Sequence, residues 1–507
     1  MIFLMTQKFP LRPTPVHRET IPSFISRLAA MRKTTTRKFA LHMGTNLRKI
    51  AEDDETALAE LAYWGGLSDV QFEEMKSWTG MRVGDVKLRF RGEDHGSRTL
   101  RSPRVRGCPI CLREDHEGKK GKPSENMAMR GHWQLRSVTA CIRHSHPLVV
   151  LWEADAVLKR YDYQARINEI APKILSGAFD QDTCEITEFD LWLDTKLDTG
   201  ADDTWLASQP LYASLTFGKL LGAEVEKLRG QTLKTKTPNS STANNTAFAI
   251  MRKGEAAIEA ILIELSEATH SGLRDKSATY GKLYHSFNEL YCTNPAFSTY
   301  QRIFRDVLLK IWDFDDGEIV LGEPLQERIL HSVTSAAGKV GTKPQLMEAY
   351  LINAGALQHD DKRPFNRKTF DAKEYIHIIE EAASLVTIGD VIKTLHATKA
   401  EVEKLILEGH IVPRTSDEKI RKKWSVKEAA EFLASLQKNV IPLQDAQGWE
   451  RLLQSSNRIK KPLTFLIDLI LNGDLKVGRM TEGFNGLVVQ KSDVDRFRDD
   501  MVDKQTK

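Results

Sequence analysis

The chain has 507 residues, which is too long for one hydrophobic core and indicates several domains. It is 41% hydrophobic and 28% charged, with a mean hydropathy of −0.38, as in ordinary globular proteins. No apolar run approaches the roughly 18 to 20 residues of a membrane span. The first residues lack the apolar core and cleavage site of a signal peptide, so we expect a cytoplasmic location.

Positive charge is concentrated in the first third of the chain. Residues 1–150 contain 26 Lys and Arg against 16 Asp and Glu, whereas the remainder contains 47 against 53. A dense set of cations precedes residue 108: Arg82, Lys87, Arg89, Arg91, Arg98, Arg101, Arg104 and Arg106. Such a stripe could neutralise phosphates, although any single arginine in it fits a solvated loop equally well.

The N-terminal region is predicted to be helical after an extended start. Prolines keep residues 8–15 out of helical geometry. A helix should follow from about Glu19, because four apolar residues share one helical face: Ile21, Phe24, Ile25 and Leu28.

Two further helices are expected, over residues 54–64 and 69–78. Two consecutive glycines separate them, and Ser68 with Gln71 forms a capping box for the second. Short helices joined by tight turns in a basic region are typical of a helix-turn-helix motif. A plain helical bundle fits nearly as well.

Three of the five cysteines lie in two short pairs that predict a zinc site. The pairs are Cys108-Pro109-Ile110-Cys111 and Cys141-Ile142-Arg143-His144, with Trp133 between them. A two-residue gap lets a tight turn aim both ligands at one point, and two such pairs supply a tetrahedral set. Four protein ligands leave no position for water, so the Zn²⁺ site would be structural. We expect one such site in the chain.

The fourth ligand has more than one candidate in the sequence. His144 has the expected spacing, but His146 lies two residues further, and His116 and His132 lie between the pairs. Ordinary buried thiols are the alternative interpretation. The remaining cysteines, Cys184 and Cys292, are isolated in sequence, and in a cytosolic chain the cluster favours metal over disulfides.

The segments around and after this cluster are expected to form a loop, a strand and a helical region. Residues 112–130 are expected to form an exposed loop, and residues 147–152 a strand that closes the zinc module. Residues 155–330 look mainly helical, with a polar linker over residues 236–246. No catalytic motif is present in this middle third.

The C-terminal third contains an internal repeat of three copies. Each copy ends in an apolar stretch, a glycine and a further apolar residue, and the glycines are Gly355, Gly409 and Gly473. The pattern predicts a helix, a turn, a capped second helix, a glycine C-cap leading into a strand, and a third helix. Third helices are expected over residues 370–379, 424–436 and 488–497.

This order is that of a winged helix-turn-helix module, in which the second helix enters the DNA major groove. Capping boxes are predicted for the second helices of copies one and two, at Thr342 with Gln345 and at Thr398 with Glu401. Helical hairpins for protein contact are the alternative, because acidic residues in copy two would repel phosphate. Candidate DNA-binding residues are Arg101, Arg104, Arg106, Lys343, Gln345, Lys399, Lys404, Arg458, Lys460 and Lys461.

Taken together, these N-terminal motifs resemble the TniQ family of transposition proteins. The resemblance is carried by residues 9–13, Glu19, residues 23–29, and the two pairs with Trp133, and it covers roughly residues 8–152. It implies that the zinc ligands are Cys108, Cys111, Cys141 and His144. Where the family often has glycine two residues after the ligand histidine, this chain has His146, and the second zinc site of some relatives is not expected here.

The resemblance implies a non-catalytic factor that selects the target site of a bacterial transposon. Its partners would be DNA, an AAA+ ATPase and a DDE transposase, with a CRISPR effector complex as a further option and a homodimer as a further state. The location would be the bacterial cytoplasm, associated with the nucleoid. The alternative is a zinc-containing helix-turn-helix transcription regulator of a mobile element.

An enzyme is the third hypothesis, since a nuclease would need clustered carboxylates such as those of residues 52–55. Such charge runs at a helix start are more often solvated surface, and we expect no catalytic activity. The predicted fold is mainly α and multidomain. The expected domains are a helical region (1–107), a zinc module (108–152), a helical middle (153–330) and three helix-turn-helix repeats (331–382, 383–437 and 438–507).

Overall fold

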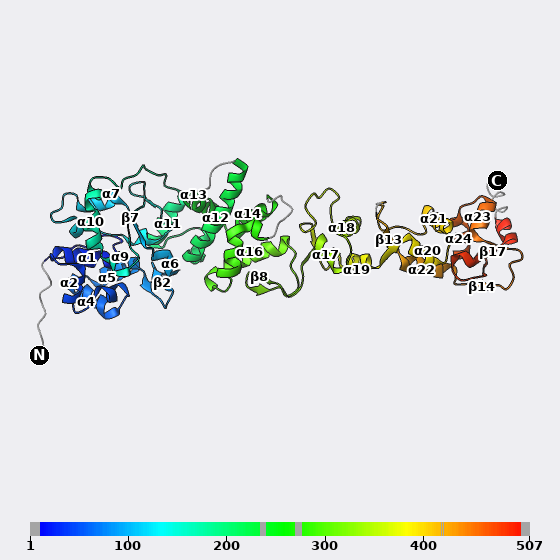
Figure 1. The fold of residues 1–507 in the computed structure, drawn as a ribbon, viewed down its shortest axis with the longest axis horizontal. Helices are drawn as coiled ribbons and strands as arrows, with labels where there is room; N and C mark the ends of the chain where they lie inside the picture. Colours follow the sequence, from blue (N-terminus) through cyan, green and yellow to red (C-terminus); the bar gives the residue numbers. More distant parts are fainter. Residues whose placement is uncertain (1–10, 234–239, 269–275, 417, 419, 498–507) are drawn as a thin grey trace. The chain divides into compact units, whose positions relative to one another are not determined.

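The structure of the chain, a computed structural model, describes residues 11–233, 240–268, 276–416, 418 and 420–497 (Figure 1). The chain is mainly helical, as predicted, and divides into two compact units. Unit 1 comprises residues 1–307 with 320–322, and unit 2 comprises residues 308–319 with 323–507. Among the described residues, no helix is both long and apolar enough to cross a membrane.

Unit 1 begins with five helices that share one hydrophobic core. The helices are α1 (Ile21–Met31), α2 (Thr36–His42), α3 (Leu47–Ala51), α4 (Glu55–Gly65) and α5 (Asp69–Thr79). Thr20 caps α1 by accepting the Ser23 N–H, and every α1 residue from Ile21 to Ala30 is buried. α1 packs against α2, α4 and α5, which favours the bundle interpretation of this region. The capping box of Ser68 with Gln71 is confirmed.

The next part of unit 1 mixes short strands and helices. Its elements are β1 (Met81–Arg82), β2 (Lys87–Phe90), β3 (Glu93–Gly96), α6 (Ser97–Leu100), β4 (Arg104–Gly107), α7 (Pro109–His116), α8 (Pro123–Asn126), η1 (Gly131–Gln134), β5 (Ala140–Cys141), β6 (His146–Pro147), β7 (Val149–Glu153), α9 (Val157–Tyr161) and α10 (Tyr163–Leu175). β1, β2 and β3 form an antiparallel sheet, and β4 pairs with β7 and β5 with β6. The strand expected over 147–152 is confirmed within one or two residues.

The prediction of an exposed loop over residues 112–130 is wrong. Most of the segment between the two ligand pairs packs inward: α7 and α8 occupy part of it, and Met127, Ala128 and Met129 are almost fully buried. Its glycines and lysines near residue 120 misled the prediction, because only that short turn is exposed. The buried residues join the core shared by β7 and α10.

The rest of unit 1 is helical, as expected. It contains α11 (Glu188–Thr199), η2 (Trp205–Ser208), α12 (Leu211–Leu233), α13 (Ser240–Met251), α14 (Glu255–Glu267), α15 (Lys276–His285), η3 (Ser286–Leu290) and η4 (Pro295–Phe297). Two further elements, α16 (Ser298–Ile311) and β8 (Ile319–Val320), span the boundary between the units, at residues 307/308 and 319/320. The linker predicted over 236–246 is wrong from Ser240 onward, where α13 begins, and residues 236–239 lie outside the described residues. The small polar residues of α13 allow close packing on α12, where Gly222 meets the Ala243 backbone.

Unit 2 begins, after β9 (Glu323–Pro324), with the three repeats, which share one plan. Repeat 1 contains β10 (Leu330–Ser332), α17 (Val333–Lys339), α18 (Pro344–Asn353), β11 (Thr369–Asp371) and α19 (Ile376–Ser384). Repeat 2 contains β12 (Leu385–Thr387), α20 (Ile388–Leu395), α21 (Lys399–Leu407), β13 (Lys422–Ser425) and α22 (Val426–Leu436). Repeat 3 contains β14 (Ile441–Pro442), β15 (Trp449–Arg451), α23 (Leu452–Ile459), α24 (Leu463–Leu471), β16 (Val477–Arg479), η5 (Phe484–Gly486), β17 (Leu487–Gln490) and a helix over 491–497.

The glycine that marks each copy ends the second helix, as predicted. Gly355, Gly409 and Gly473 have φ angles of 79°, 80° and 83°, a conformation that side chains other than glycine rarely adopt. In each repeat a strand just before the first helix pairs antiparallel with a strand just before the third helix. This pairing closes each helix-turn-helix on itself.

Three details of the repeat prediction are wrong. Strands do not follow Gly355 and Gly409 directly; the next strands begin at residues 369 and 422. Thr342 does not cap α18, because Pro344 takes the first helical position and shifts the cap to Lys343. The third helices begin later than expected, at residues 376, 426 and 491, since residues 369–371, 422–425 and 487–490 form the strands β11, β13 and β17. The capping box of Thr398 with Glu401 is confirmed.

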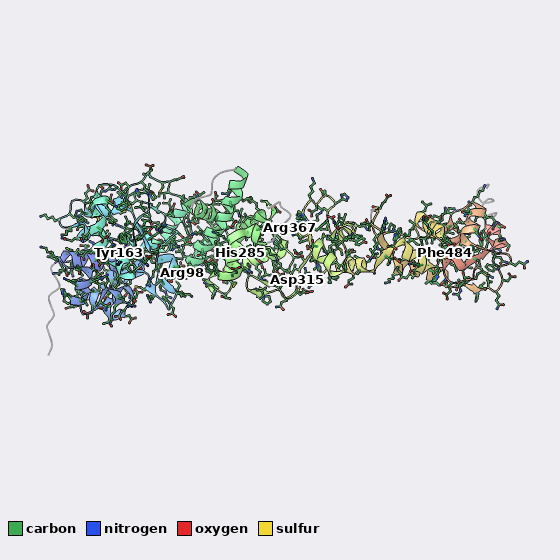
Figure 2. The ribbon with its side chains drawn as sticks, viewed as in Figure 1. Arg98, Tyr163, His285, Asp315, Arg367 and Phe484 are labelled. Carbon is green, nitrogen blue, oxygen red and sulfur yellow. The ribbon has the colours of Figure 1, made fainter. Side chains whose placement is uncertain are left out.

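Repeats 2 and 3 share one hydrophobic core, whereas repeat 1 has its own. In repeat 1, Arg367 lies over the Trp312 ring, 4.0 Å from its centroid. In the shared core, Phe484 of repeat 3 stacks on Phe432 of repeat 2, with ring centroids 6.4 Å apart. Arg367 and Phe484 are labelled in Figure 2. Repeats 2 and 3 therefore form one packed body.

A carboxylate of repeat 2 caps a helix of repeat 3 in this body. Glu408, whose side chain is 10% exposed, accepts the backbone N–H groups of Leu463 (3.1 Å) and Thr464 (2.6 Å) at the start of α24. Lys404 lies 3.0 Å from the same carboxylate. Burial alone would raise the pKa of Glu408, but these bonds to its ionised form hold the pKa at about 2.

We expect Glu408→Gln to destabilise the body of repeats 2 and 3 by about 1–3 kcal/mol at pH 7. The folded-state pKa lies below the value of about 4.3 in the unfolded chain, so this contribution is present above pH ~4.3 and is lost as the pH falls toward 2. Hydrogen exchange of α24 amides at several pH values measures it. Glu403→Gln, which removes a 58% exposed carboxylate from the same helix, is the control. Equal effects of both variants would contradict the capping role.

Candidate metal centre

The local fold brings four ligand atoms together from two places in unit 1. Cys108 is the N-cap of α7, Pro109 sets the first turn, and the Cys111 N–H points at the Cys108 sulfur at 3.5 Å. Cys141 ends β5, and the tight turn that follows places His144 back over it. The positive end of α7 favours a thiolate at Cys108.

The spacing of these atoms fits a tetrahedral ion. The sulfurs of Cys111 and Cys141 are 3.6 Å apart, and the His144 Nδ1 lies 3.3 Å from the Cys111 sulfur and 3.5 Å from those of Cys108 and Cys141. Ideal Zn–S and Zn–N bonds of about 2.3 and 2.0 Å give tetrahedral edges of about 3.8 Å (S–S) and about 3.5 Å (S–N). All four atoms lie within 4.8 Å of one another.

Because these ligand atoms are buried, ionising the thiols without a nearby cation is energetically unfavourable. The three cysteines are 0–5% exposed. The pKa of Cys111 is raised because its thiol contacts the sulfurs of Cys108 and Cys141 and is buried, whereas the pKa of Cys141 is lowered by bonds from those two thiols. Three buried sulfurs ionise together only around a positive ion, which is what a divalent metal supplies. The donor set therefore suits Zn²⁺.

The other histidines considered as ligands are engaged elsewhere. His146 accepts the Gln181 N–H at Nε2 (2.8 Å), and its Nδ1 contacts the Pro147 carbonyl at 2.7 Å. His116 contacts the Asn126 side chain at 3.0 Å. His132 is buried between Trp78 and Trp133, and its pKa is lowered well below the usual value mainly by that burial. Within the described residues, His144 is the histidine that joins the three thiols.

A carboxylate lies behind the histidine of the site. His144 presents Nδ1 to the sulfurs, and its Nε2 lies 3.1 Å from Glu114 of α7. Arg143 lies 3.0 Å from the other oxygen of that carboxylate. A carboxylate at this position fixes the orientation of a metal-bound imidazole and makes it a better ligand. Nothing in the spacing of the sequence had indicated Glu114.

We expect Glu114→Gln to lower zinc affinity by about 10- to 100-fold while leaving the protein folded. Competition with a chelator of known affinity measures the effect. Glu117→Gln, an exposed position on the next turn of the chain, is the control. An unchanged zinc affinity in the Glu114 variant would show that the carboxylate does not support the ligand.

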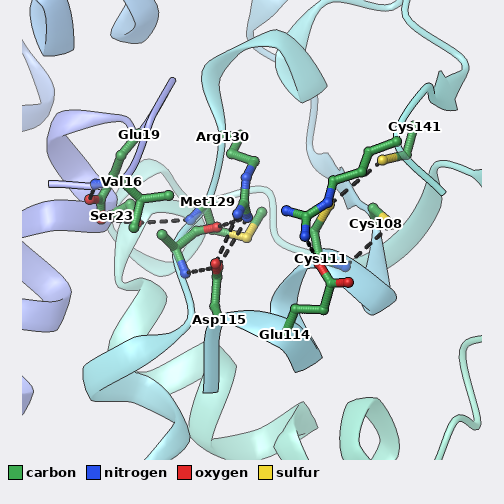
Figure 3. Close-up of polar contacts among 12 residues, drawn as sticks. Val16, Glu19, Ser23, Cys108, Cys111, Glu114, Asp115, Met129, Arg130 and Cys141 are labelled. Carbon is green, nitrogen blue, oxygen red and sulfur yellow. Dashed lines mark hydrogen bonds and ion pairs between the residues drawn. The ribbon is translucent and has the colours of Figure 1, made fainter. Parts of the chain in front are cut away.

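A buried polar network joins α1 to the segment beside the site (Figure 3). Asp115 pairs with Arg130 (2.8 Å) and accepts the Ala128 N–H (3.0 Å). The Met129 N–H donates to Ser23 of α1 at 2.9 Å, and Ser23 donates to Glu19 at 2.8 Å. The metal site and the N-terminal helices are thereby held in one structure.

Glu19 has a second buried partner at the centre of this network. Its Oε2 lies 2.7 Å from Arg27, and these two side chains are 0% and 6% exposed. Arg27 also donates to the carbonyl groups of Thr14 (3.3 Å) and Glu125 (3.2 Å). The sequence motif contained both residues, but nothing in it indicated that they pair.

The basic stripe before the site divides into exposed and internal arginines. Arg106 donates to the Trp133 and Leu135 carbonyl groups, and burial lowers its pKa. Arg91 lies over Trp78 and donates to the Leu197 and Asp198 carbonyl groups. Arg101 lies 3.6 Å from Asp53, and Arg104 lies 2.8 Å from Glu153. The exposed members are Arg82, Lys87, Arg89, Arg98 and Arg104.

The acidic run over residues 52–55 serves the local structure. Asp54 caps α4 by accepting the Ala57 N–H at 2.9 Å, and Asp53 accepts the Arg82 N–H at 2.9 Å. Glu52 pairs with Arg48 at 2.9 Å. These carboxylates thus have partners from several directions and do not form a metal-binding group among the described residues.

The candidate DNA-binding residues of the repeats lie in different surroundings. In repeat 1, Lys343 and Gln345 are exposed at the start of α18. In repeat 2, Lys399 lies 3.6 Å from Glu403 and Lys404 lies 3.0 Å from Glu408. In repeat 3, Arg458 pairs with Glu450 and Asp495, each at 2.5 Å; Lys460 is exposed and Lys461 half-buried in the turn before α24.

Fold and site together define a multi-repeat, helix-turn-helix protein with a buried Cys₃His cluster beside an N-terminal helical bundle. Residues 10–148 match the model of the TniQ family, and they include the bundle and all four cluster residues. The resemblance to this family is confirmed, and the chain contains a TniQ domain that ties it to transposition. A search of curated proteins found no match.

Proposed function

We propose that this chain selects the target site of a bacterial transposon by binding DNA and recruits the AAA+ ATPase and DDE transposase of that element. The match of residues 10–148 to the TniQ family carries the proposal, because members of that family are generally non-catalytic adaptors of transposition. The helix-turn-helix repeats of unit 2 supply modules of the kind that bind DNA.

In this proposal the TniQ domain is the part that meets the other transposition proteins. Its metal centre would hold one structural Zn²⁺ through Cys108, Cys111, Cys141 and His144. The ion would fix α7 and the β5–β6 turn against the rest of the domain and would take no part in chemistry. The exposed arginines of the stripe, such as Arg98 and Arg104, would add contacts to DNA phosphates.

A transcription regulator of a mobile element is the second candidate, since the repeats would serve it equally well. The two functions differ in their partners. Co-purification of the full chain with the products of neighbouring genes tests this directly. Capture of an ATPase and a transposase that depends on the TniQ domain supports transposition, whereas promoter binding without either partner supports regulation.

Direct DNA targeting is tested separately from partner binding. The full chain is incubated with a random-sequence duplex pool across a salt series, and bound duplexes are sequenced. Selection of one sequence with a steep salt dependence supports direct reading of the target. Weak binding without selection contradicts it and supports targeting through a partner such as a CRISPR effector complex.

A further inference from the structure

The three repeats differ in whether their second helix is available to DNA. In a helix-turn-helix module the N-terminal residues of the second helix contact base edges, so this part must be exposed and must not carry uncompensated negative charge. The contacts described above allow each repeat to be judged by this requirement. The argument rests on the proposed DNA-binding function.

In repeat 3 the start of the second helix is covered by repeat 2. Glu408 occupies the N–H groups of Leu463 and Thr464, and His410 contacts the Thr464 hydroxyl at 2.9 Å. Asp468 is the single charged residue of α24. Side chains of repeat 2 thus occupy the N-terminal N–H groups of α24 that a DNA phosphate would otherwise approach.

In repeat 2 the cations of the second helix are neutralised within the helix. Lys399 lies 3.6 Å from Glu403, and Lys404 lies 3.0 Å from Glu408. The same helix exposes 79% of Leu407, an apolar side chain that offers no hydrogen bond to a base. α21 therefore presents a balanced charge and an apolar end.

In repeat 1 the corresponding face is open and carries free cations. Lys339 at the end of α17 and Lys343 before α18 are exposed, and neither has an ion pair among the described residues. Glu348, the one acidic residue of α18, is paired with Lys368. The negative charge on this helix is therefore compensated.

The outward face of α18 also has side chains suited to base edges. Met347, Tyr350 and Leu351 point into the core and Ile352 packs against it, which leaves Gln345 exposed, with the half-buried Ala349 following at four residues. A glutamine can bond an adenine in the major groove, and small apolar side chains can contact a thymine methyl. The lysines beside them can contact the flanking phosphates.

We infer that repeat 1 is the DNA-reading module of unit 2, with α18 as its recognition helix, and that repeats 2 and 3 form a body that does not read bases through α21 or α24. Gln345 contacts a base, and Lys339 and Lys343 contact phosphates. The DNA sequence that unit 2 recognises is therefore the length that one helix-turn-helix module contacts.

The test compares matched pairs in the full chain, using the duplex enriched from the random pool as probe. Gln345→Ala is expected to reduce sequence selectivity at one base pair of the selected duplex. The preference for the selected base over the other three bases at that position should fall roughly 5- to 150-fold. Lys339→Ala with Lys343→Ala is expected to weaken binding to all duplexes and to reduce the salt slope by about 1 per lysine. The control Lys460→Ala with Lys461→Ala changes the equivalent turn of repeat 3 and should leave the selected sequence unchanged.

The possible outcomes separate the inference from the function on which it rests. Loss of sequence preference in the repeat 3 variant, with preference retained in the Gln345 variant, overturns the assignment to repeat 1. An unchanged base preference in the Gln345 variant also overturns it. If the unaltered chain selects no sequence, direct DNA reading itself fails, which is seen before any variant is compared.

Discussion

Replacement of Cys108 and Cys141 by alanine together is expected to abolish zinc binding and unfold the segment that contains α7, α8 and the β5–β6 turn. Each of these cysteines supplies one sulfur to the four-atom cluster, and both side chains are buried. Structural zinc sites in small modules contribute an apparent ~10–16 kcal/mol at pH 7, more than the short elements here could replace by packing. Zinc content by elemental analysis and hydrogen exchange over residues 108–152 measure both effects.

The two cysteines outside the cluster provide matched controls. Cys184→Ser and Cys292→Ser change half-buried thiols that are not part of the group and should retain one zinc per chain. His144→Gln should lower zinc affinity, whereas His146→Gln should retain zinc because His146 contacts Gln181 and Pro147 instead. A folded, zinc-loaded double cysteine variant would refute the assignment.

Replacement of Arg27 by alanine is expected to destabilise the TniQ domain by about 3–5 kcal/mol. The change leaves the Glu19 carboxylate, which is fully buried, without its 2.7 Å partner. It also removes the donors to the Thr14 and Glu125 carbonyl groups. Hydrogen exchange of the α1 amides reports the local free energy of opening without requiring the whole chain to unfold in one step.

The control for this prediction is an exposed ion pair in the same domain. Arg48→Ala removes a partner of Glu52, and these side chains are 72% and 41% exposed. Its effect on stability should be much smaller than that of Arg27→Ala, because exposed ion pairs are screened by solvent. If both variants lose similar stability, the buried pair has no special role in holding α1 to the segment beside the metal site.

Features that depend on local spacing were predictable from the sequence. The two ligand pairs, the helix expected from about Glu19, the capping box at Ser68 and the glycine ends of the repeats each follow from residues within one or two turns. The structure confirms these elements. It brings Cys108, Cys111, Cys141 and His144 to one point, as the pairs had indicated.

Features that depend on distant partners were not predictable. Residues 112–130 have the composition of a loop, yet Met129 is buried where its N–H donates to Ser23 of α1, and Asp115 is buried where it pairs with Arg130 and accepts the Ala128 N–H. The acidic residues of repeat 2 had already counted against DNA binding by that copy, whereas the contacts of Glu408 with the start of α24 arise only from the fold. Glu114 was missed for the same reason, since its relation to His144 arises only when the two ligand pairs meet.

The core shared by repeats 2 and 3 determines where this chain can be shortened. α24 is apolar on several sides, with Leu463, Leu466 and Ile467 fully buried and Leu471 about half exposed, in a body to which repeat 2 contributes part of the packing. A truncation between residues 437 and 438 would expose the apolar residues of repeat 3 that pack against repeat 2, and this exposure favours aggregation. Fragments made to locate the partners of this protein should therefore keep repeats 2 and 3 together, and a boundary before repeat 2 has to allow for Leu385, which packs in the core of repeat 1.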